Sequence, residues 1–135
     1  MGYSFLEHTA DVKFRASGES LKEMFVFAAE AFNETVRGNI KILEQEERTF
    51  EVEGGDKMSL LYNFLEEFLI LLEKDDFLVS KIKEIEVSNN KLKCIVSGDS
   101  AGNYKFTNDV KAVTYSEMFV REKEKKWECQ VVLDV

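Results

Sequence analysis

The chain has 135 residues, of which 44% are hydrophobic and 33% are charged, and we expect residues 1–135 to form one globular domain. Its net charge of −8 repels phosphate, which disfavours direct binding of nucleic acid and favours a cation or a basic protein partner. No apolar run is long enough to cross a membrane, and the N-terminus lacks the features of a signal peptide, so we predict a cytoplasmic protein without membrane contact.

An alternating pattern near the N-terminus predicts a first strand over residues 3–16. Polar residues alternate there with an apolar face made of Leu6, His8, Ala10, Val12, Phe14 and Ala16. A period of two is typical of a strand with one buried face.

Capping signals predict the first helix, from about residue 20 to residue 37. Ser20 and Glu23 have the spacing of a capping box, in which each side chain binds a backbone amide of the other residue. Gly38 stands where a glycine commonly ends a helix.

A short strand over residues 48–53 is followed by a second helix, which Asp56 is suited to cap and which ends near residue 75. Apolar residues cover about half of this helix: Met58, Leu60, Leu61, Phe64, Leu65, Phe68, Leu69, Leu71 and Leu72. A surface helix has a narrower apolar stripe. We therefore expect both helices to pack between sheet layers, or between a sheet and each other.

The second half of the chain predicts two hairpins. Residues 82–88 and 91–97 flank Asn89-Asn90, which tolerates the backbone of a tight turn, and residues 108–121 pair with 126–135. The expected fold class is α+β, with two helices packed with sheet layers in a β/α/β-type sandwich. The element order is β-α-β-α-β-β-β-β.

The polar runs and the thiols suggest no site of their own. We expect the acidic clusters at 44–47 and 122–126 to be solvated loops. Cys94 and Cys129 are in phase with apolar neighbours, so buried thiols are expected.

The usual catalytic and nucleotide-binding motifs are absent from the sequence. His8, the one histidine, has no second histidine as a partner. It is either a histidine at the edge of the core or a metal ligand or proton carrier. No pair of nucleophile and base is visible, so we predict that the chain is not itself an enzyme.

Asp11 and Asp134 offer a candidate cation site. Asp is disfavoured within strands, and Asp134 is followed only by Val135. If the first and last strands are neighbours, two carboxylates and a backbone carbonyl converge, and such oxygen ligands suit Ca²⁺ or Mg²⁺. The alternative is two exposed acids with no shared role.

Four stretches of the chain resemble the archease family. They are Glu7-His-Thr-Ala-Asp-Val12, the leucine-rich run 60–69 with its paired glutamates, Lys111-Ala-Val-Thr-Tyr-Ser-Glu-Met118, and the final Leu133-Asp-Val135. They occur in the family's order and together span the whole chain.

The resemblance implies an accessory protein of tRNA splicing. Archeases help a GTP-dependent RNA ligase that joins 3′-phosphate (or 2′,3′-cyclic phosphate) and 5′-hydroxyl ends, by promoting guanylylation of the ligase and its multiple turnover. The family's metal site maps onto Asp11, Asp134 and the carbonyl oxygen of Val135, and its functional lysine maps onto Lys111. RNA would be contacted only through the ligase.

One position departs from the family pattern. Archeases commonly carry His after Thr-Tyr, whereas this chain has Ser116, followed by Glu117 where Asp is frequent. Serine is not a base near neutral pH, but Glu117 keeps an oxygen ligand available. We therefore expect an oxygen-ligand cation site, with His8 and Glu117 as secondary candidates.

Two rival functions remain open. The protein could be a chaperone-like modulator of a tRNA-modifying enzyme, such as a methyltransferase, with no metal role. A metal-dependent hydrolase acting alone is less favoured, because the site has few ligands and no candidate base.

Overall fold

The computed structural model describes residues 1–7, 11–106 and 110–135, which form two sheets, two long helices and one short 3₁₀ helix. The elements are, in chain order, β1 (Gly2–Leu6), β2 (Val12–Gly18), α1 (Leu21–Arg37), β3 (Glu46–Glu53), α2 (Lys57–Asp75), β4 (Phe77–Ser88), β5 (Lys91–Ser100), the 3₁₀ helix η1 (Ala101–Asn103), β6 (Ala112–Lys123) and β7 (Lys126–Asp134). The predicted α+β class is confirmed.

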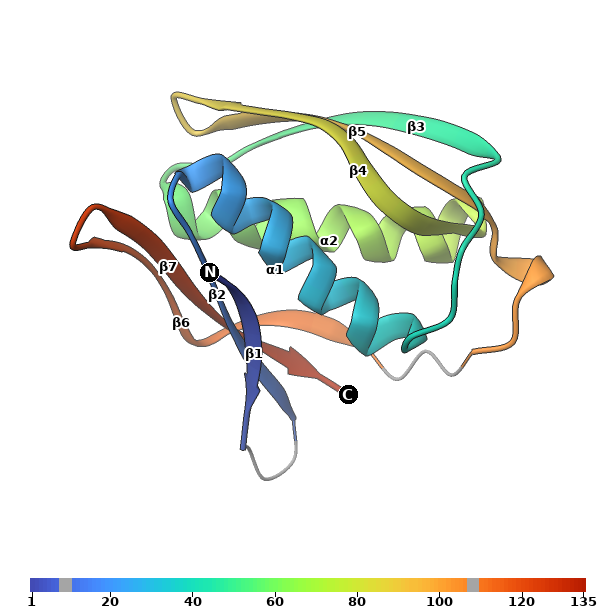
Figure 1. Cartoon of the computed structure of the whole chain (residues 1–135), viewed down its shortest axis with the longest axis horizontal. Helices are drawn as coiled ribbons and strands as arrows, with labels where there is room; N and C mark the ends of the chain where they lie inside the picture. Colours follow the sequence, from blue (N-terminus) through green and yellow to red (C-terminus); the bar gives the residue numbers. More distant parts are fainter. Residues whose placement is uncertain (8–10, 107–109) are drawn as a thin grey trace.

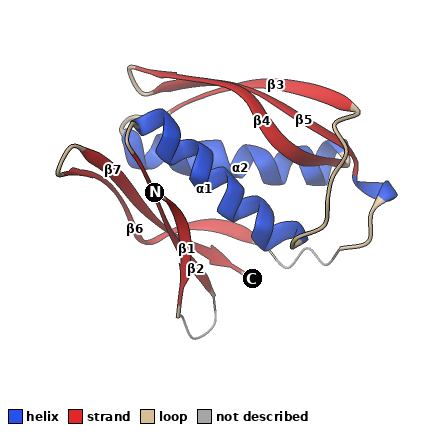
Figure 2. Ribbon diagram, in the orientation of Figure 1, coloured by secondary structure: helices blue, strands red, loops and turns tan. Residues whose placement is uncertain are grey.

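The two helices lie between the two sheets (Figure 1). Within the described residues, one sheet has the strand order β1-β2-β7-β6 and the other β3-β5-β4, and all the pairings are antiparallel. Figure 2 shows both sheets in red on either side of the blue helices. Each helix contacts strands of both sheets, so the first of the two packing hypotheses is correct.

The N-terminal strand prediction over 3–16 was wrong in one respect, because this stretch forms a hairpin. β1 pairs with β2 so that Phe5 lies opposite Phe14. Asp11 therefore stands just before β2 rather than inside a strand, and His8 and Ala10 lie outside the described residues. Alternation continues along both arms of a hairpin, so the period of two does not reveal where a chain reverses.

Side-chain caps fix both helix starts. The amide of Glu23 donates to Ser20 Oγ over 3.1 Å, as predicted, whereas the Glu23 carboxylate accepts from the amide of Glu19, one residue before the cap. At α2, the amide of Ser59 donates to Asp56 Oδ1 over 2.8 Å, and Ser59 Oγ accepts from the amide of Asp56. The predicted boundaries of both helices are confirmed to within one residue.

A cluster of phenylalanines joins the helices to the three-stranded sheet. Phe64 of α2 meets Phe25 of α1 with ring centroids 5.4 Å apart, and Phe50 of β3 packs edge-on against Phe68 of α2. Phe25 and Phe64 are fully buried. The broad apolar surface of α2 is therefore covered from several directions, as its sequence required.

The two C-terminal hairpins are confirmed, with longer or shorter arms. Asn89 and Asn90 both have positive φ, 50° and 59°, in the turn between β4 and β5. β4 begins at Phe77, five residues before the predicted start, and β6 begins at Ala112. The thiols of Cys94 and Cys129 are buried, as expected.

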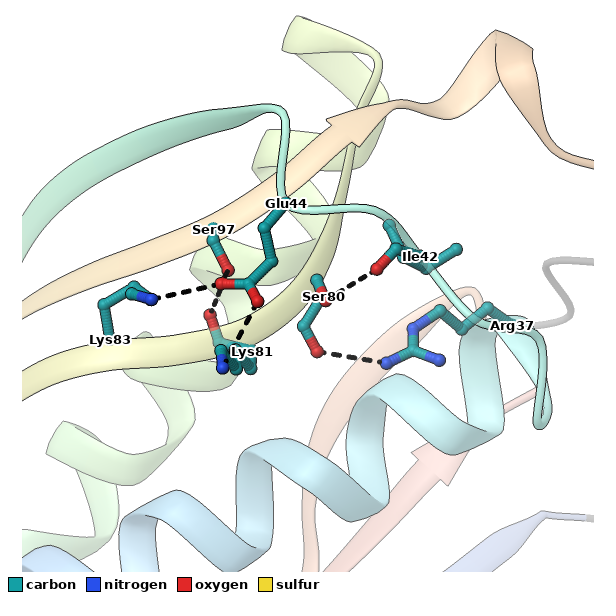
Figure 3. A network of polar contacts seen from close by, with 7 residues as sticks. All are labelled: Arg37, Ile42, Glu44, Ser80, Lys81, Lys83 and Ser97. Carbon is teal, nitrogen blue, oxygen red and sulfur yellow. Dashed lines mark hydrogen bonds and ion pairs between the residues drawn. The ribbon is translucent and has the colours of Figure 1, made fainter.

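Glu44 anchors the segment between α1 and β3 rather than lying in a solvated loop (Figure 3). Its carboxylate accepts a hydrogen bond from Ser97 Oγ over 2.8 Å, and Lys83 Nζ and Lys81 Nζ each lie 3.2 Å from one of its oxygens. Ser80 Oγ also donates to the carbonyl of Ile42 over 2.8 Å. These bonds fasten the segment to β4 and β5.

Replacing Gly98 with alanine should clearly lower the stability of the fold. A Cβ at Gly98 would lie 2.2 Å from the carbonyl oxygen of Leu78 on the paired strand, where backbone cannot move aside, whereas a Cβ at Gly55 meets nothing within 4 Å. We expect Gly98→Ala to lower the free energy of unfolding by about 2 kcal/mol or more, and Gly55→Ala to change it by less than about 0.5 kcal/mol. Urea denaturation of both variants measures this, and equal stability would contradict it.

The contacts of Glu44 should make the stability of the fold fall in acid. The hydrogen bond from Ser97, followed by Lys83 and Lys81, lowers the pKa of Glu44 from 4.5 to about 2. A carboxylate whose pKa is lower in the folded than in the unfolded protein stabilises the fold at pH values above its unfolded-state pKa. The native protein should therefore exceed Glu44→Gln in free energy of unfolding by a full margin above pH 4.5, and this margin should disappear as the pH falls through about 2.

The matched control is Glu47→Gln, since the Glu47 carboxylate forms no ion pair within the described residues. Its stability relative to the native protein should stay constant over the same pH range in chemical denaturation. A constant difference for Glu44→Gln as well would show that the network contributes nothing through its charge.

Candidate functional site

The pairing of β2 with β7 brings a segment near the N-terminus beside the last strand of the chain. Val12 lies opposite Leu133 in this antiparallel pair. Asp11 precedes Val12 and Asp134 follows Leu133, so the register continued by one residue sets the two acids opposite each other. The inference that an N-terminal and a C-terminal strand are neighbours is confirmed, although the N-terminal strand is the second one.

Lys111 joins the same end of the four-stranded sheet. Its backbone amide donates to the carbonyl oxygen of Asp134 over 2.7 Å, and Ala112 is the register partner of Asp134. Asp134 and Lys111 are exposed and Asp11 is partly exposed. Asp11, Lys111 and Asp134 thus lie at the same end of three adjacent strands, where Lys111 and Asp134 are exposed.

Asp134 belongs to the outer face of this sheet. Val131 and Leu133 of β7 are fully buried against the helices. Since side chains alternate along a strand, Asp134 lies on the opposite face. A cation held by this residue would therefore be bound from the outside of the sandwich, without opening the core.

The donor atoms suit a hard cation with few protein ligands. Among the described residues, no three His, Cys, Asp or Glu side chains gather into a metal site. The predicted set therefore comprises two carboxylates, Asp11 and Asp134, and the carbonyl oxygen of Val135. Ca²⁺ and Mg²⁺ accept oxygen ligands of this kind, and Mg²⁺ retains several waters when protein ligands are few.

Soft ligands do not contribute to this site. Cys94 and Cys129 are fully buried, and burial raises the pKa of each thiol to about 12. Thiolate is the form that binds metals, so both remain neutral thiols in the core. His8, a secondary candidate, lies outside the described residues.

Glu117 sits in a bulge of β6 that the sequence analysis missed. The register between β6 and β7 shifts between Thr114 and Phe119, and Glu117 has a φ of 54°. A signal was available, because Val113 and Met118 are both apolar and both face inward. Residues five apart can share a face of a strand only if an odd number of extra residues lies between them, and here β6 advances five residues from Thr114 to Phe119 while β7 advances two.

An ion pair from this bulge reaches across β7 to β2. Glu117 Oε1 lies 3.0 Å from Lys13 Nζ. Val132 of β7 pairs with Lys13 on one side and with Thr114 on the other, and it is 1% exposed although it faces outward. The Lys13–Glu117 bridge therefore helps to cover Val132, and the Glu117 carboxylate has a structural partner beside the candidate site.

Gln130 holds the backbone of the bulge. Its Nε2 donates to the carbonyl oxygen of Glu117 over 2.7 Å, and its Oε1 accepts from Arg15 Nε over 2.8 Å. Gln130 is 5% exposed, so these bonds replace those it would make with water. The shape of β6 at the bulge is held by Lys13, Arg15 and Gln130, which no sequence motif marked.

An exposed aromatic pair lies beside the bulge. Tyr115 of β6 stacks on Tyr62 of α2, with ring centroids 4.2 Å apart and planes within 5°. Tyr115 remains 49% exposed. Tyrosines with one accessible face commonly contribute to protein interfaces.

No helix within the described residues is long and apolar enough to span a membrane.

Comparison with known proteins gives consistent matches along the chain. The model of the Archease protein family matches residues 3–135. Protein archease of Methanosarcina mazei is 35% identical over 140 residues, which cover 98% of this chain and 95% of that protein. Protein archease-like of Drosophila melanogaster is 35% identical over 146 residues, covering 100% of this chain and 91% of that protein.

Solved structures share the fold. The solution structure of protein 1598 of Methanobacterium thermoautotrophicum superposes with a TM-score of 0.84 at 32% identity, covering 99% of each chain. A crystal structure from Thermotoga maritima, described as an archease and possible chaperone, gives a TM-score of 0.69 at 22% identity over 96% of this chain and 94% of that one, which shows the fold alone. Since the family model and close relatives match almost the whole chain, the chain belongs to the archease family.

Proposed function

We propose that this chain is an accessory protein of tRNA splicing, which activates the GTP-dependent ligase that joins 3′-phosphate and 5′-hydroxyl RNA ends. It promotes guanylylation of the ligase and lets it turn over repeatedly. Membership of the archease family supports the proposal. The single observation that carries it is the register of β2 and β7, which, continued by one residue, sets Asp11 opposite Asp134 at the end of these two strands.

In this proposal the chain's own oxygens hold a divalent cation, Ca²⁺ or Mg²⁺. The carboxylates of Asp11 and Asp134 and the carbonyl oxygen of Val135 are the ligands. A cation bound there supplies positive charge that offsets the charge of phosphate oxygens. The exposed ammonium of Lys111, whose backbone amide is bonded to Asp134, contacts a phosphate or offsets the carboxylates.

The remaining charge of the chain favours a protein partner. A net charge of −8 attracts a basic surface of the ligase and repels free RNA, so RNA is met only through the ligase. The chain needs no nucleophile for this role, and its two thiols are poor ones because burial raises their pKa to about 12. The chemistry belongs to the partner.

The bulge in β6 orients this surface. Lys13 and Gln130 bind the side chain and the carbonyl of Glu117, so the segment between Lys111 and Phe119 has one defined shape. We assign Glu117 to shaping the surface, because its carboxylate is already paired with an ammonium.

A chaperone-like role without a metal is the second candidate. The exposed Tyr115, supported by Tyr62, offers an aromatic contact that needs no cation. The Thermotoga maritima protein of the same fold is described as a possible chaperone. In this version the partner is a tRNA-modifying enzyme such as a methyltransferase, and the acids are ordinary surface residues.

Single-turnover guanylylation of the ligase separates the two candidates. We expect Asp11→Asn and Asp134→Asn to reduce the stimulation by at least about tenfold, since loss of even an indirect metal contact commonly costs that much. Glu122→Gln, an equal change of charge at another exposed acid, should stimulate like the native protein. Full stimulation by both Asp variants would exclude the metal role, and the chaperone candidate would replace it.

Direct metal titration tests the site without the ligase. Calorimetry with Ca²⁺ and with Mg²⁺ should show binding to the native protein and at least about tenfold weaker binding to Asp134→Asn. Ser116→His should change the affinity little, because the donors are oxygens and histidine suits softer metals. A large gain of affinity in Ser116→His would mean that serine at this position marks a weakened site.

A further inference from the structure

A polar pocket lies apart from Asp11 and Asp134, and neither acid lines it. It has a volume of about 450 Å³ and is bounded by β1, α1 and β4. β1 is an edge of one sheet and β4 an edge of the other, and α1 lies between them (Figure 2). Its walls include Tyr3, Val26, Glu30, Asn33, Glu34 and Ile82.

Asn33 is a buried polar side chain without a protein partner. It is 8% exposed, it lines the pocket, and its carboxamide makes no hydrogen bond within the described residues. Buried amides are nearly always hydrogen-bonded, because an unpaired one has lost its water and gained nothing. The pocket is the direction from which such a partner can come.

Two carboxylates lie beside Asn33, and the charge of Arg37 acts on one of them, Glu34. Glu30 and Glu34 are one turn apart on α1, and neither forms an ion pair within the part of the chain that is described. Burial raises the pKa of Glu30. The pKa of Tyr3 is raised first by burial and then by the charges of Glu34 and Glu30. The Tyr3 hydroxyl therefore lies near both carboxylates.

The basic residues of the pocket are occupied elsewhere. The Arg37 guanidinium donates to the carbonyls of Ile40 over 2.9 Å, Val79 over 3.1 Å and Ser80 over 3.3 Å. Lys81 lies 3.2 Å from a Glu44 oxygen (Figure 3). Both cations thus support the fold, although the charge of Arg37 also acts on Glu34 and Tyr3. Glu30, whose pKa is raised by burial with no cation among the described residues to offset it, is the carboxylate left to attract a positive group from outside.

We propose that this pocket binds a basic side chain of a partner protein, an ammonium or guanidinium group at the end of an aliphatic stem. Val26, Ala29 and Ile82 offer apolar contact to the methylene groups of the stem. The Asn33 carbonyl and the two carboxylates accept hydrogen bonds from the charged head. The net charge of −8 draws basic partners to the surface in which the pocket lies. This site depends neither on a metal nor on the proposed ligase.

The test is a nuclear magnetic resonance titration of the isotope-labelled protein at low salt. The probes are n-butylguanidinium, n-butylammonium, a blocked Gly-Arg-Gly peptide, and butyramide as an uncharged probe. We expect the cationic probes to shift the resonances of Asn33, Glu30 and Glu34, and butyramide to leave them in place. Glu30→Gln/Glu34→Gln should weaken binding of the peptide by at least about tenfold, because hydrogen bonds to charged groups are the stronger ones.

The matched control is Glu51→Gln/Glu86→Gln, which removes the same charge from exposed acids on the three-stranded sheet and should bind the peptide like the native protein. Asn33→Leu tests the buried amide. If Asn33→Leu is unfolded, Glu30→Gln/Glu34→Gln still tests the pocket, because these two glutamates lie at the surface of α1. Asp134→Asn should bind the probes normally, so this result is independent of the proposed function. The proposal would be overturned if Glu30→Gln/Glu34→Gln and Glu51→Gln/Glu86→Gln weakened binding of the peptide equally, or if no cationic probe shifted the resonances. Binding of the free cations but not of the peptide would also overturn it.

Discussion

The pairing of β2 with β7 is the constraint on which the rest of the structure depends. It joins residues about 120 positions apart in the chain, and it buries Phe14, Val131 and Leu133 under the helices. Closing so long a loop costs conformational entropy, but that cost rises only slowly with loop length. The same pairing that completes the core sets Asp11 beside Asp134, so the spacing of the two acids cannot change without disturbing the fold.

On the outer face of the same sheet, side-chain bonds connect neighbouring strands. The side chain of Gln130 accepts a hydrogen bond from Arg15 and donates one to the carbonyl of Glu117 in the bulge. Lys13 forms an ion pair with the carboxylate of Glu117. Each of these bonds crosses between strands, so the position of β6 follows from that of β2 through β7. The exposed Lys111 directly precedes β6, and its backbone amide is bonded to Asp134 of β7, so its backbone is placed by the same sheet.

Local signals in the sequence were enough to predict the helices and turns. Ser20 and Asp56 start α1 and α2, and Asn89-Asn90 turns the β4–β5 hairpin, because capping and positive φ are local requirements. The hairpin within residues 3–16 was missed because a reversal of the chain leaves the apolar alternation intact. The bulge at Glu117 was missed although the five-residue spacing of Val113 and Met118 signalled it. The partners of Glu44 were also missed, because they come from strands far along the chain. For the site, sequence alone predicted that two chain ends meet, whereas Lys13, Arg15 and Gln130 matter through contacts that no spacing announces.

The two proposed sites are linked through the first hairpin. β2 begins next to Asp11, and its residue Ala16 lies opposite Tyr3 of β1, which lines the α1 pocket. Five residues of extended strand separate Asp11 from Ala16, a distance of about 17 Å. A protein interface of ordinary size covers about 800 Å² on each partner, which is wide enough to span that distance. Asp134 faces outward from the four-stranded sheet, whereas Tyr3 lies on the helix side with the buried Ala16, so one basic partner reaches both sites only by extending around the edge strand β1. The pairing of β1 with β2 then sets the spacing between the two contacts.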